Sequence, residues 1–471
     1  MKVLFAASEG YPFAKTGGLG DVIGSLPAEL KKKGLDVRVI MPKYDQIPQE
    51  FKSKMKSVAE FSIRLNRVVR YCRIESMSYN GMVYYFIDNE YYFKQSSYYG
   101  YSDEVEKFIY FSKAILDSLR EINYCPDIIH CHDWHTALIP FLIKRKYSDT
   151  FYGKIKTVLT IHNLKYQGIL SKDFLNGLIE LENGSSEIEF NGYANLLKGG
   201  ISSADLVTTV SPTYAREIQN ENLGEGLEPV LRANHQKIRG ILNGIDYNLY
   251  NPETDKSLYS KYTNSYSEKI KNKIEFQNKF GLTEGADIPM IAVISRLTEQ
   301  KGIDLIKEQI DNILCFDLQL VVLGVGERRY EEFFADSALR YPGKLCTFIK
   351  FDESLSRQIY GATDMVLMPS KFEPCGLTQM IAMRYGAVPI VRATGGLKDS
   401  VISFEKSEKG TGFNFNHYDG EEMKETILKA IKVYSQKDKW MLLFHNAIDT
   451  DLSWSRSVTE YIKEYEEIFN C

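Results

Sequence analysis

The sequence predicts an α/β protein made of two doubly wound domains, each a parallel sheet with helices on its faces. Short apolar runs alternate with longer amphipathic segments along most of the 471 residues, and this alternation is typical of parallel strands joined by helical crossovers. The pattern stops near residue 241 and restarts near residue 290. A chain of this length suits two or three domains, so two such units account for most of it.

The first half of the chain contains several apolar runs of strand length. We expect strands at residues 3–7, 37–41, 127–131, 156–161 and 205–210. Residues 56–101 alternate β-branched and aromatic side chains, which indicates strands or hairpins with loops. Residues 102–119 have the spacing of a helix, and Pro212 suits the first turn of another, where proline is favoured.

The second half repeats this arrangement. Strands are expected at residues 290–295, 318–323, 345–349, 364–368 and 387–391, each with a helix pattern behind it. The expected domains are therefore 1–241 and 242–454, and the last helix, within 455–471, is a candidate for crossing back to the first domain. Two doubly wound units in one chain place a ligand in the cleft between them, at the carboxyl ends of the strands.

Composition excludes several classes of partner. The net charge of −4 gives no basic field for nucleic acid. No apolar run approaches the length that spans a membrane, and the short run at the N-terminus lacks a signal-peptide pattern. The seven cysteines are scattered without a dense framework, which indicates a reducing compartment. We therefore expect a cytoplasmic protein with no nucleic-acid or membrane partner.

The segment Lys-Thr-Gly-Gly-Leu-Gly-Asp-Val at 15–22 lies between the first expected strand and an amphipathic helix. Three glycines in four positions allow backbone N–H groups to approach a ligand closely, and the positive end of the helix points to the same place. The spacing is that of neither a Walker loop nor a G-x-G-x-x-G loop. The loop suits a phosphate or a phosphorylated sugar. The alternative is a glycine turn that only packs the strand against the helix, with Lys15 solvated.

Other polar clusters also follow the ends of expected strands. They are His162 with Asn163, Arg296 with Lys301, residues 373–378 and residues 394–397. Three cations and two helix N-termini converging on one cleft would stabilise a departing diphosphate, because its negative charge grows as its bond to carbon breaks. A single Arg or Lys on a loop is more often a solvated surface charge, and only the set favours a site.

Glu373 would lie close to the sugar of such a ligand. A carboxylate can accept hydrogen bonds from sugar hydroxyls and can stabilise an oxocarbenium-like centre. The alternative is an exposed acid that the helix dipole favours at a helix N-terminus.

The segment His-Cys-His-Asp-Trp-His at 130–135 contains the side-chain types of a metal site. Neighbours on a strand point to opposite faces, and no Cys-x-x-Cys partner exists elsewhere in the sequence. We therefore favour a core or cleft role and expect no metal site. The acidic triplet at 449–451 resembles a metal-binding motif of other sugar transferases, but its position near the last helix favours a cap.

Seven motifs, in order, resemble those of the starch and glycogen synthase family of the ADP-glucose type, and the resemblance covers nearly the whole chain. They are Lys-Thr-Gly-Gly-Leu-Gly-Asp-Val at 15–22, His-Asp-Trp-His at 132–135, Thr-Ile-His-Asn at 160–163, Leu-Asn-Gly-Ile-Asp at 242–246, Ser-Arg-Leu-Thr-Glu-Gln-Lys-Gly at 295–302, Glu-Pro-Cys-Gly-Leu-Thr-Gln at 373–379 and Thr-Gly-Gly-Leu at 394–397. Each motif alone is modestly specific, whereas seven in the family's order are highly specific.

The resemblance implies a glycosyltransferase-B fold, with two Rossmann-like domains facing across a cleft. It implies transfer of glucose from ADP-glucose to the 4-hydroxyl at the non-reducing end of an α-1,4-glucan, with retention of anomeric configuration, in glycogen biosynthesis. It implies neither a metal nor another cofactor. The first domain would be the acceptor side and the second the nucleotide-sugar side. Whether ADP-glucose or UDP-glucose is preferred stays open, as does the oligomeric state.

The resemblance also implies roles for single residues, carried over by matching position. Lys15, Arg296 and Lys301 would hold the diphosphate, and N–H donors would come from Gly17, Gly18, Cys375, Gly376, Leu377, Thr378, Gly395 and Gly396. The catalytic set would be Glu373, His162, Asp133, Arg296 and Lys301. His162 and Asn243 would orient the sugar and the acceptor, and Glu9, Asp133 and Asn163 would lie near the acceptor. Residues 88–101, including Tyr92 and Phe93, depart from the sequence pattern of the family. Which residues of this loop contact the glucan therefore stays open.

Three other functions are weighed against this one. A nucleotide-sugar epimerase on the same plan would need a base at a sugar carbon and no glucan site. A glucan-binding regulatory protein with an inactive cleft would have lost the charges of the cleft, yet Lys15, Arg296, Lys301 and Glu373 are all present. A phosphorylase would need a lysine that holds pyridoxal phosphate, and no motif identifies one. Fold analogy alone decides none of these.

Overall fold

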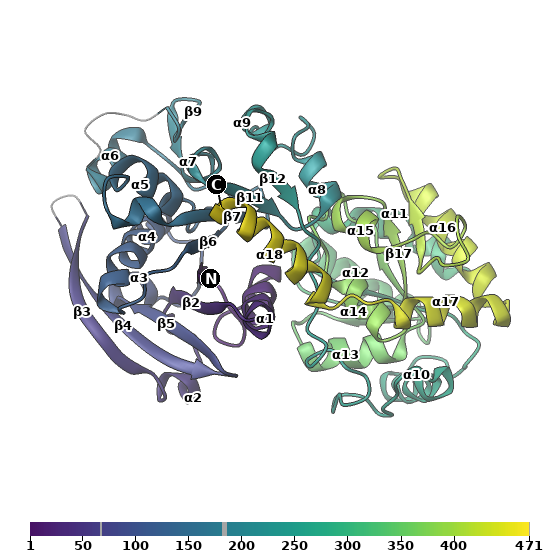
Figure 1. Ribbon diagram of the computed structural model, residues 1–471. Coiled ribbons are helices and arrows are strands. Elements are labelled where there is room, and N and C mark those ends of the chain that lie inside the picture. Colours follow the sequence, from purple (N-terminus) through teal and green to yellow (C-terminus); the bar gives the residue numbers. More distant parts are fainter. Residues whose placement is uncertain (66–67, 181–185, 471) are drawn as a thin grey trace. The chain divides into compact units, whose positions relative to one another are not determined.

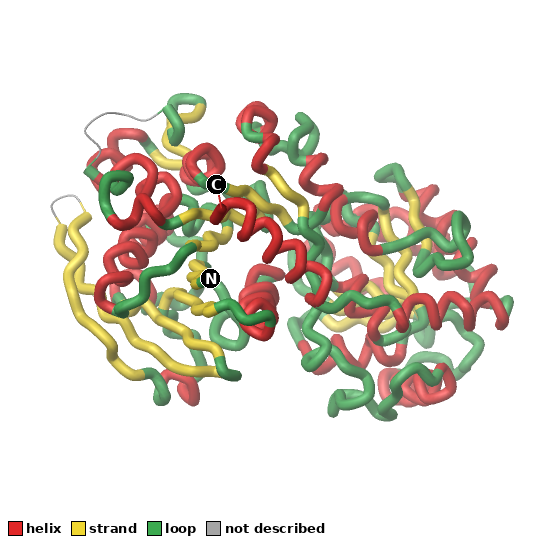
Figure 2. The backbone as a smooth tube through the Cα atoms, viewed as in Figure 1, coloured by secondary structure: helices red, strands yellow, loops and turns green. Residues whose placement is uncertain are grey.

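The computed structural model describes residues 1–65, 68–180 and 186–470, and the chain divides into two compact units. The first unit consists of Met1–Asn243 together with Trp454–Cys471, and the second of Gly244–Ser453. In each unit, strands form a sheet that is covered by helices (Figure 1, Figure 2). The predicted α/β class with two Rossmann-like units is therefore confirmed.

The first unit is built on a nine-stranded sheet. Its strands lie in the order β12 (Ile238–Gly240), β11 (Leu206–Thr209), β7 (Lys156–Ile161), β6 (Ile128–His132), β1 (Lys2–Ala6), β2 (Asp36–Pro42), β5 (Met82–Asp88), β4 (Val68–Tyr79) and β3 (Lys56–Leu65). The strands from β12 to β5 are parallel, and β4 and β3 are antiparallel additions at one edge (Figure 1). The strands or hairpins predicted within 56–101 are these last three strands.

Helices and one small sheet complete this unit. The helices are α1 (Gly18–Lys32), α2 (Gln49–Lys52), α3 (Glu90–Phe93), α4 (Glu104–Glu121), α5 (Leu138–Lys146), α6 (Lys172–Ile179), α7 (Leu196–Ser203), α8 (Pro212–Glu217), α9 (Glu228–Ala233) and α18 (Trp454–Asn470), with short 3-10 turns η1 (Phe151–Lys154) and η2 (His235–Lys237). The small antiparallel sheet has the order β8 (Ile169–Leu170), β10 (Tyr193–Asn195) and β9 (Glu189–Phe190).

The helix ends follow from the residues that lie there. Pro212 occupies the first turn of α8, as predicted, and the Ser211 hydroxyl before it accepts the Tyr214 N–H at 3.2 Å. In α1 the buried residues Val22, Ile23 and Leu26 recur at helical spacing and pack toward the sheet. The long apolar runs of β1 and β6 are buried because parallel strands carry helices on both faces.

The second unit has a six-stranded, wholly parallel sheet. Its order is β15 (Leu345–Phe348), β14 (Gln319–Leu323), β13 (Met290–Ile294), β16 (Met365–Met368), β17 (Val388–Arg392) and β18 (Phe413–Phe415). The helices are α10 (Tyr266–Phe280), α11 (Ile303–Leu314), α12 (Arg328–Arg340), α13 (Glu353–Ala362), α14 (Thr378–Arg384), α15 (Gly395–Ser400), α16 (Gly420–Tyr434) and α17 (Lys437–Asp449), with the 3-10 turn η3 (Glu299–Lys301). The five strands predicted for this half are all present.

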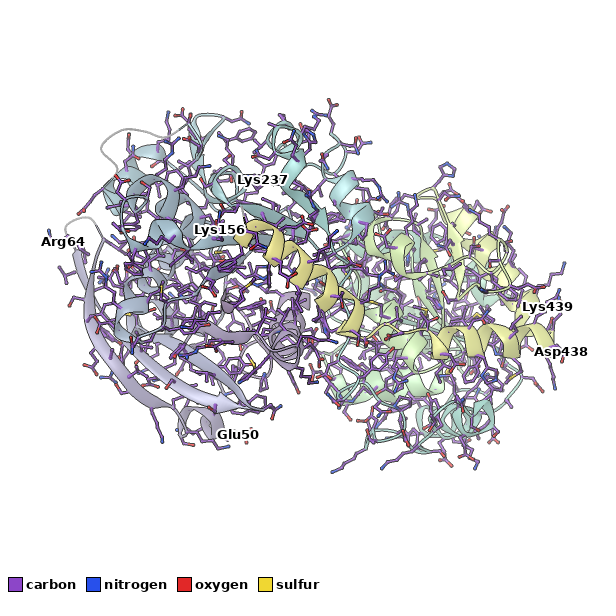
Figure 3. All side chains as sticks on the ribbon, in the orientation of Figure 1. Glu50, Arg64, Lys156, Lys237, Asp438 and Lys439 are labelled. Atoms are coloured by element: carbon purple, nitrogen blue, oxygen red, sulfur yellow. The ribbon has the colours of Figure 1, made fainter. Side chains whose placement is uncertain are left out.

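The final helix, α18, belongs to the first unit although it follows the second in sequence. It packs against α1, and its Tyr461 and Tyr465 side chains are fully buried. Before α18, the Asp451 carboxylate accepts the Ser453 N–H at 2.9 Å. This bond to the residue two positions on is that of an Asx turn. Figure 3 shows how densely side chains surround both sheets, and it labels Lys156 at the start of β7.

Candidate active site

Three neighbouring strands of the first unit end beside one another, and each is followed by residues singled out from the sequence. In the sheet, β7 pairs with β6 and β6 pairs with β1, all in parallel. The glycine-rich loop at 15–22 follows β1, Asp133 follows β6, and His162 follows β7. Because parallel strands share one carboxyl edge, the first unit brings these three segments together.

The glycine-rich loop leads directly into α1. Gly17 precedes the helix in an extended conformation (φ −162°), and within the described chain no side chain caps its first turn. A Cβ at Gly20 would lie 3.0 Å from the Lys15 side chain, so glycine allows the loop to fold against that lysine. The Lys15 ammonium lies 2.8 Å from the Asp21 carboxylate, and each side chain is only 19% exposed. Lys15 is therefore held in place rather than freely solvated.

Glu9 anchors this loop through hydrogen bonds to Thr16. Its side chain is buried, and its two oxygens accept the Thr16 N–H and the Thr16 hydroxyl, each at 2.6 Å. The Tyr99 hydroxyl donates to the same carboxylate at 2.7 Å. The geometry gives Glu9 a role in fixing the glycine-rich loop, in addition to the acceptor contact that the sequence predicts.

Asp133 holds the end of β7. Its backbone has a positive φ of 56°, which is uncommon for a residue other than glycine. Its Oδ1 accepts the N–H groups of His162 at 2.7 Å and of Asn163 at 3.3 Å. Burial raises the pKa of this carboxyl group to about 7, although the two N–H bonds act in the opposite direction and the Glu9 charge adds to the rise.

His130, His132 and His162 are each held by side-chain hydrogen bonds. His130 is bonded to the Tyr465 hydroxyl at 2.7 Å and to the Thr160 hydroxyl at 2.5 Å. His132 Nδ1 lies 3.0 Å from His162 Nε2. Burial lowers the pKa of all three imidazoles, to about 3 for His162, which keeps them neutral. Among the described residues no group of three or more potential ligands could hold a metal ion.

Asn243 and the aromatic segment at 90–93 follow two other parallel strands of the first sheet, β12 and β5. Asn243 is 5% exposed, and its buried Oδ1 has no hydrogen-bond partner in the described ranges. Tyr92 and Phe93 are wholly buried in α3 and pack against Tyr110. These two aromatic side chains are core residues, so packing accounts for them without a glucan contact.

In the second unit, three neighbouring parallel strands again end beside one another. The order β13, β16, β17 places the loops at 295–302, 369–378 and 393–397 at one edge. The Lys301 ammonium lies 2.5 Å from Glu373 Oε2, and the Ser370 hydroxyl donates to the same oxygen at 3.0 Å. Glu373 is 5% exposed and lies five positions before the first residue of α14, so it is not the exposed helix-terminal acid of the alternative interpretation.

Glycines allow these loops to touch. A Cβ at Gly395, whose φ is 45°, would lie 1.9 Å from the Glu373 carbonyl oxygen, and a Cβ at Gly396 would lie 2.2 Å from the Cys375 carbonyl oxygen. The Gly396 N–H donates to the carbonyls of Glu373 and Pro374, at 3.1 and 3.2 Å. That N–H group therefore already serves the contact between the two loops.

The remaining predicted donor residues surround this pair. Arg296 is exposed and makes one long contact of 3.5 Å with Gln300. Gly376 has a φ of 72° in the bend before α14, and the Gln379 amide donates to the carbonyls of Cys375 and Gly376, at 3.1 and 2.8 Å. Leu377 immediately precedes α14 and Thr378 begins it, and both residues are partly exposed.

Sequence reasoning missed several supporting residues. Ser370, which donates to Glu373, and Tyr99, which donates to Glu9, belong to no motif. Their contacts join segments that the sequence pattern does not relate, so no local signal identifies them. Gln379 ends the motif at 373–379, and its amide contacts are the one such role that the motif itself could have indicated.

Comparison with known proteins identifies the family. Residues 2–233 match the starch synthase catalytic domain, and residues 274–441 match the group 1 glycosyl transferases. A glycogen synthase from Anoxybacillus flavithermus is 48% identical over 99% of this chain and 98% of its own. One from Alkaliphilus metalliredigens is 47% identical over 99% of this chain and 100% of its own.

Two solved structures share the fold. The catalytic domain of starch synthase IV from Arabidopsis thaliana, bound to ADP and acarbose, has a TM-score of 0.93 and 33% identity, over 100% of this chain and 99% of that one. Sucrose-phosphate synthase from Thermosynechococcus elongatus has a TM-score of 0.65 and 15% identity, and it shows the fold alone.

The chain has two Rossmann-like units with glycine-rich loops at their strand ends, and the second unit carries the Lys301–Glu373 pair. These features define a two-domain glycosyltransferase of the B type. The chain belongs to the glycogen synthase family, which confirms the resemblance drawn from the seven motifs and makes it a hexosyltransferase. In the described part of the chain, every helix is too short or too polar to span a bilayer.

Proposed function

We propose that this chain transfers glucose from ADP-glucose to the 4-hydroxyl at the non-reducing end of an α-1,4-glucan, with retention of anomeric configuration, and so builds glycogen. Relatives of about the same length that are named glycogen synthase support it, as does the ADP and acarbose in the starch synthase structure. The single observation that carries it is the contact of Lys301 with the buried Glu373, at 2.5 Å, on touching loops. The family leaves no support for the epimerase and phosphorylase alternatives.

The second unit is the nucleotide-sugar side in this proposal. Arg296 and Lys301 bind the diphosphate, and backbone N–H groups at 375–378 with Gly395 assist them. Preorganised charges of this kind act most strongly when the diphosphate departs, because negative charge develops on it in the transition state. Glu373 binds the glucose and stabilises the positive charge at its anomeric carbon. Its contact with Lys301 keeps the carboxylate oriented until the substrate arrives.

The first unit supplies the acceptor side. Asp133, Asn163 and Glu9 lie near the acceptor, and His162 and Asn243 orient the sugar. The buried, unpartnered Oδ1 of Asn243 fits such a role, since a buried amide oxygen without a partner within the described chain needs one. Lys15, with the N–H groups of Gly17 and Gly18, contributes to the diphosphate contacts. His162 is a poor general base in this scheme because burial lowers its pKa to about 3.

The function is tested with purified protein, glycogen and one nucleotide-glucose at a time. We expect ADP-glucose to be consumed, with ADP released and the glucan chains lengthened. Complete digestion of the new linkages by an α-1,4-specific glucosidase would establish retention. Nucleotide release without chain extension would contradict the synthase function, and faster use of UDP-glucose would contradict only the donor.

The site residues are tested by removing one cation at a time. Lys15→Ala, Arg296→Ala and Lys301→Ala should each reduce kcat/KM by about a hundredfold or more, since one electrostatic group typically supplies about 2–4 kcal/mol. Lys350→Ala is the matched control, because Lys350 is half-exposed and, among the residues described, its ion pair is with nearby Asp352 at 2.9 Å. Near-normal rates in all three variants would contradict the diphosphate assignment.

A further inference from the structure

His132 and His162 are linked side chain to side chain at the carboxyl edge of the first sheet. His132 ends β6, and His162 follows β7, the neighbouring strand. The Nδ1 atom of His132 lies 3.0 Å from Nε2 of His162. His132 is fully buried, with its ring stacked on Phe5 at 5.3 Å between centroids, whereas His162 is partly exposed. The buried ring therefore reaches the more exposed one through a single hydrogen bond.

Only one of the two nitrogens in that bond can be the donor, and the rest of His132 decides which. Its Nε2 is buried and has no hydrogen-bond partner among the described residues. If His162 donated, the proton of a neutral His132 would sit on Nε2 as a buried N–H without an acceptor. Buried N–H groups without a partner are rarer than buried acceptors without one. In the favoured arrangement His132 is protonated at Nδ1, and its buried Nε2 carries no proton.

The state of His162 follows directly. Its Nε2 then accepts the bond from His132, so a neutral His162 carries its proton on Nδ1. In the described ranges, Nδ1 of His162 has no partner of its own. Burial lowers the pKa of both rings, which agrees with two neutral imidazoles. Asp133 fixes the backbone of His162 through the 2.7 Å bond to its N–H, so both the main chain and the ring are oriented.

We propose that His132 is a positioning residue that fixes the tautomer of His162, so that His162 presents an Nδ1–H donor to a hydroxyl or ring oxygen of the sugar. The identity of the sugar rests on the proposed function, whereas the tautomer does not. In this arrangement His162 donates a hydrogen bond to the sugar and does not remove a proton from it.

Two isosteric amides separate positioning from packing. In His132→Asn the amide N–H takes the place of the imidazole Nδ1–H, so the donor to His162 is kept. In His132→Gln the amide N–H takes the place of Nε2 instead. The variant therefore carries the same amide group, but its N–H no longer points to His162. We expect kcat of the asparagine variant to stay within about threefold of the parent. The glutamine variant should lose about ten- to a hundredfold, as residues that orient a functional histidine typically do.

The tautomer is read independently of activity by nuclear magnetic resonance of protein labelled with ¹⁵N-histidine. In the parent protein and in His132→Asn, we expect His162 protonated at Nδ1 and bare at Nε2. In His132→Gln, the Nε2–H form should appear. His130→Leu is the control, because His130 is equally buried in the same strand but bonds to Tyr465 and Thr160 instead. It should lower the melting temperature and leave the tautomer of His162 unchanged.

Each outcome is decisive. An Nε2–H form of His162 in the parent protein overturns the proposal, and this measurement needs no variant that folds. Equal kcat for the asparagine and glutamine variants overturns the positioning role. A parent protein that has the expected tautomer but does not extend glucan would contradict the proposed function and leave the assignment of His162 intact.

Discussion

Glu373 is almost wholly buried, and its carboxylate contacts both Lys301 and Ser370. Glu373→Gln keeps the shape and the Ser370 contact but removes the charge. We expect kcat to fall about a hundred- to a thousandfold, because one transition-state contact of this type supplies about 3–4 kcal/mol. The affinity for ADP should change far less, because ADP lacks the glucose.

Steady-state kinetics and calorimetric titration with ADP measure the two effects separately. Ser370→Ala is the control, because it removes one neutral donor and should cost only about 1 kcal/mol. Unchanged turnover in Glu373→Gln would show that the residue acts through packing alone.

Asp133 makes stability depend on pH. Its pKa is about 7 in the folded protein and near 3.8 when exposed. Between these values the folded state holds a proton that the unfolded state has lost, so stability falls as pH rises from about 4 to 7 and then levels off. The full effect is at most about 4 kcal/mol.

Asp133→Asn removes this dependence while keeping an oxygen for the His162 and Asn163 N–H groups. The melting temperature of the variant relative to the parent should therefore rise between pH 5 and pH 8. Thermal unfolding at the two pH values measures it. A difference that is the same at both would show that Asp133 is ionised throughout.

At the scale of elements, glycine has two different roles: Gly395 allows two loops to touch, whereas Gly17 leaves space beside the start of α1. Gly395→Ala places a Cβ 1.9 Å from the Glu373 carbonyl at a positive φ, so the two loops must separate. We expect a lower melting temperature and at least a tenfold loss of kcat, since the Lys301–Glu373 geometry depends on that contact. Gly17→Ala meets no described atom within 4 Å and should leave the melting temperature unchanged. Under the proposed donor contact of Gly17, the added Cβ would meet the substrate, so KM for ADP-glucose should rise.

The same two assays, thermal unfolding and kinetics with varied ADP-glucose, apply to both variants. A Gly395→Ala protein with parental stability would mean that the contact between the loops contributes little.

The sequence pattern predicts long strands well and does not predict very short ones. The strand predicted at residues 156–161 is β7, Lys156–Ile161, because five consecutive apolar and β-branched residues after Lys156 give a clear signal. β12 and β18, with three residues each, were not predicted, because three positions are too few for any periodicity. They are held by pairing with a longer neighbour, β11 and β17.

The candidate site follows the same logic. The loops that carry Lys15, His162 and Glu373 were located because each follows a predicted strand. The long-range hydrogen bonds within each unit were not predicted, since Tyr99 reaches Glu9 across 90 positions and Lys301 reaches Glu373 across 72. Such contacts depend on strand order in the sheet, which the sequence does not encode locally.

For the whole molecule, the decisive feature is that the first unit is assembled from both ends of the chain. α18 contributes Trp454, Tyr461 and Tyr465 to its core, and the Tyr465 hydroxyl bonds to His130. Burial of a large apolar side chain contributes about 1.5–3 kcal/mol, so removing the helix costs on the order of 5–10 kcal/mol. That is comparable to the total stability of a domain.

A chain that ends at Ser453 should therefore lose protection in the first unit only. Hydrogen–deuterium exchange followed by mass spectrometry measures this, with peptides from β1 and β6 exchanging much faster than in the full chain. Peptides from β13 and β14 should be unchanged, because α18 is not part of the second unit. Tyr465→Phe is the matched control, since it removes only the hydroxyl and should cost about 1 kcal/mol. Faster exchange in both units alike would mean that they unfold together, and unchanged exchange in β1 would mean that α18 adds nothing to the first core.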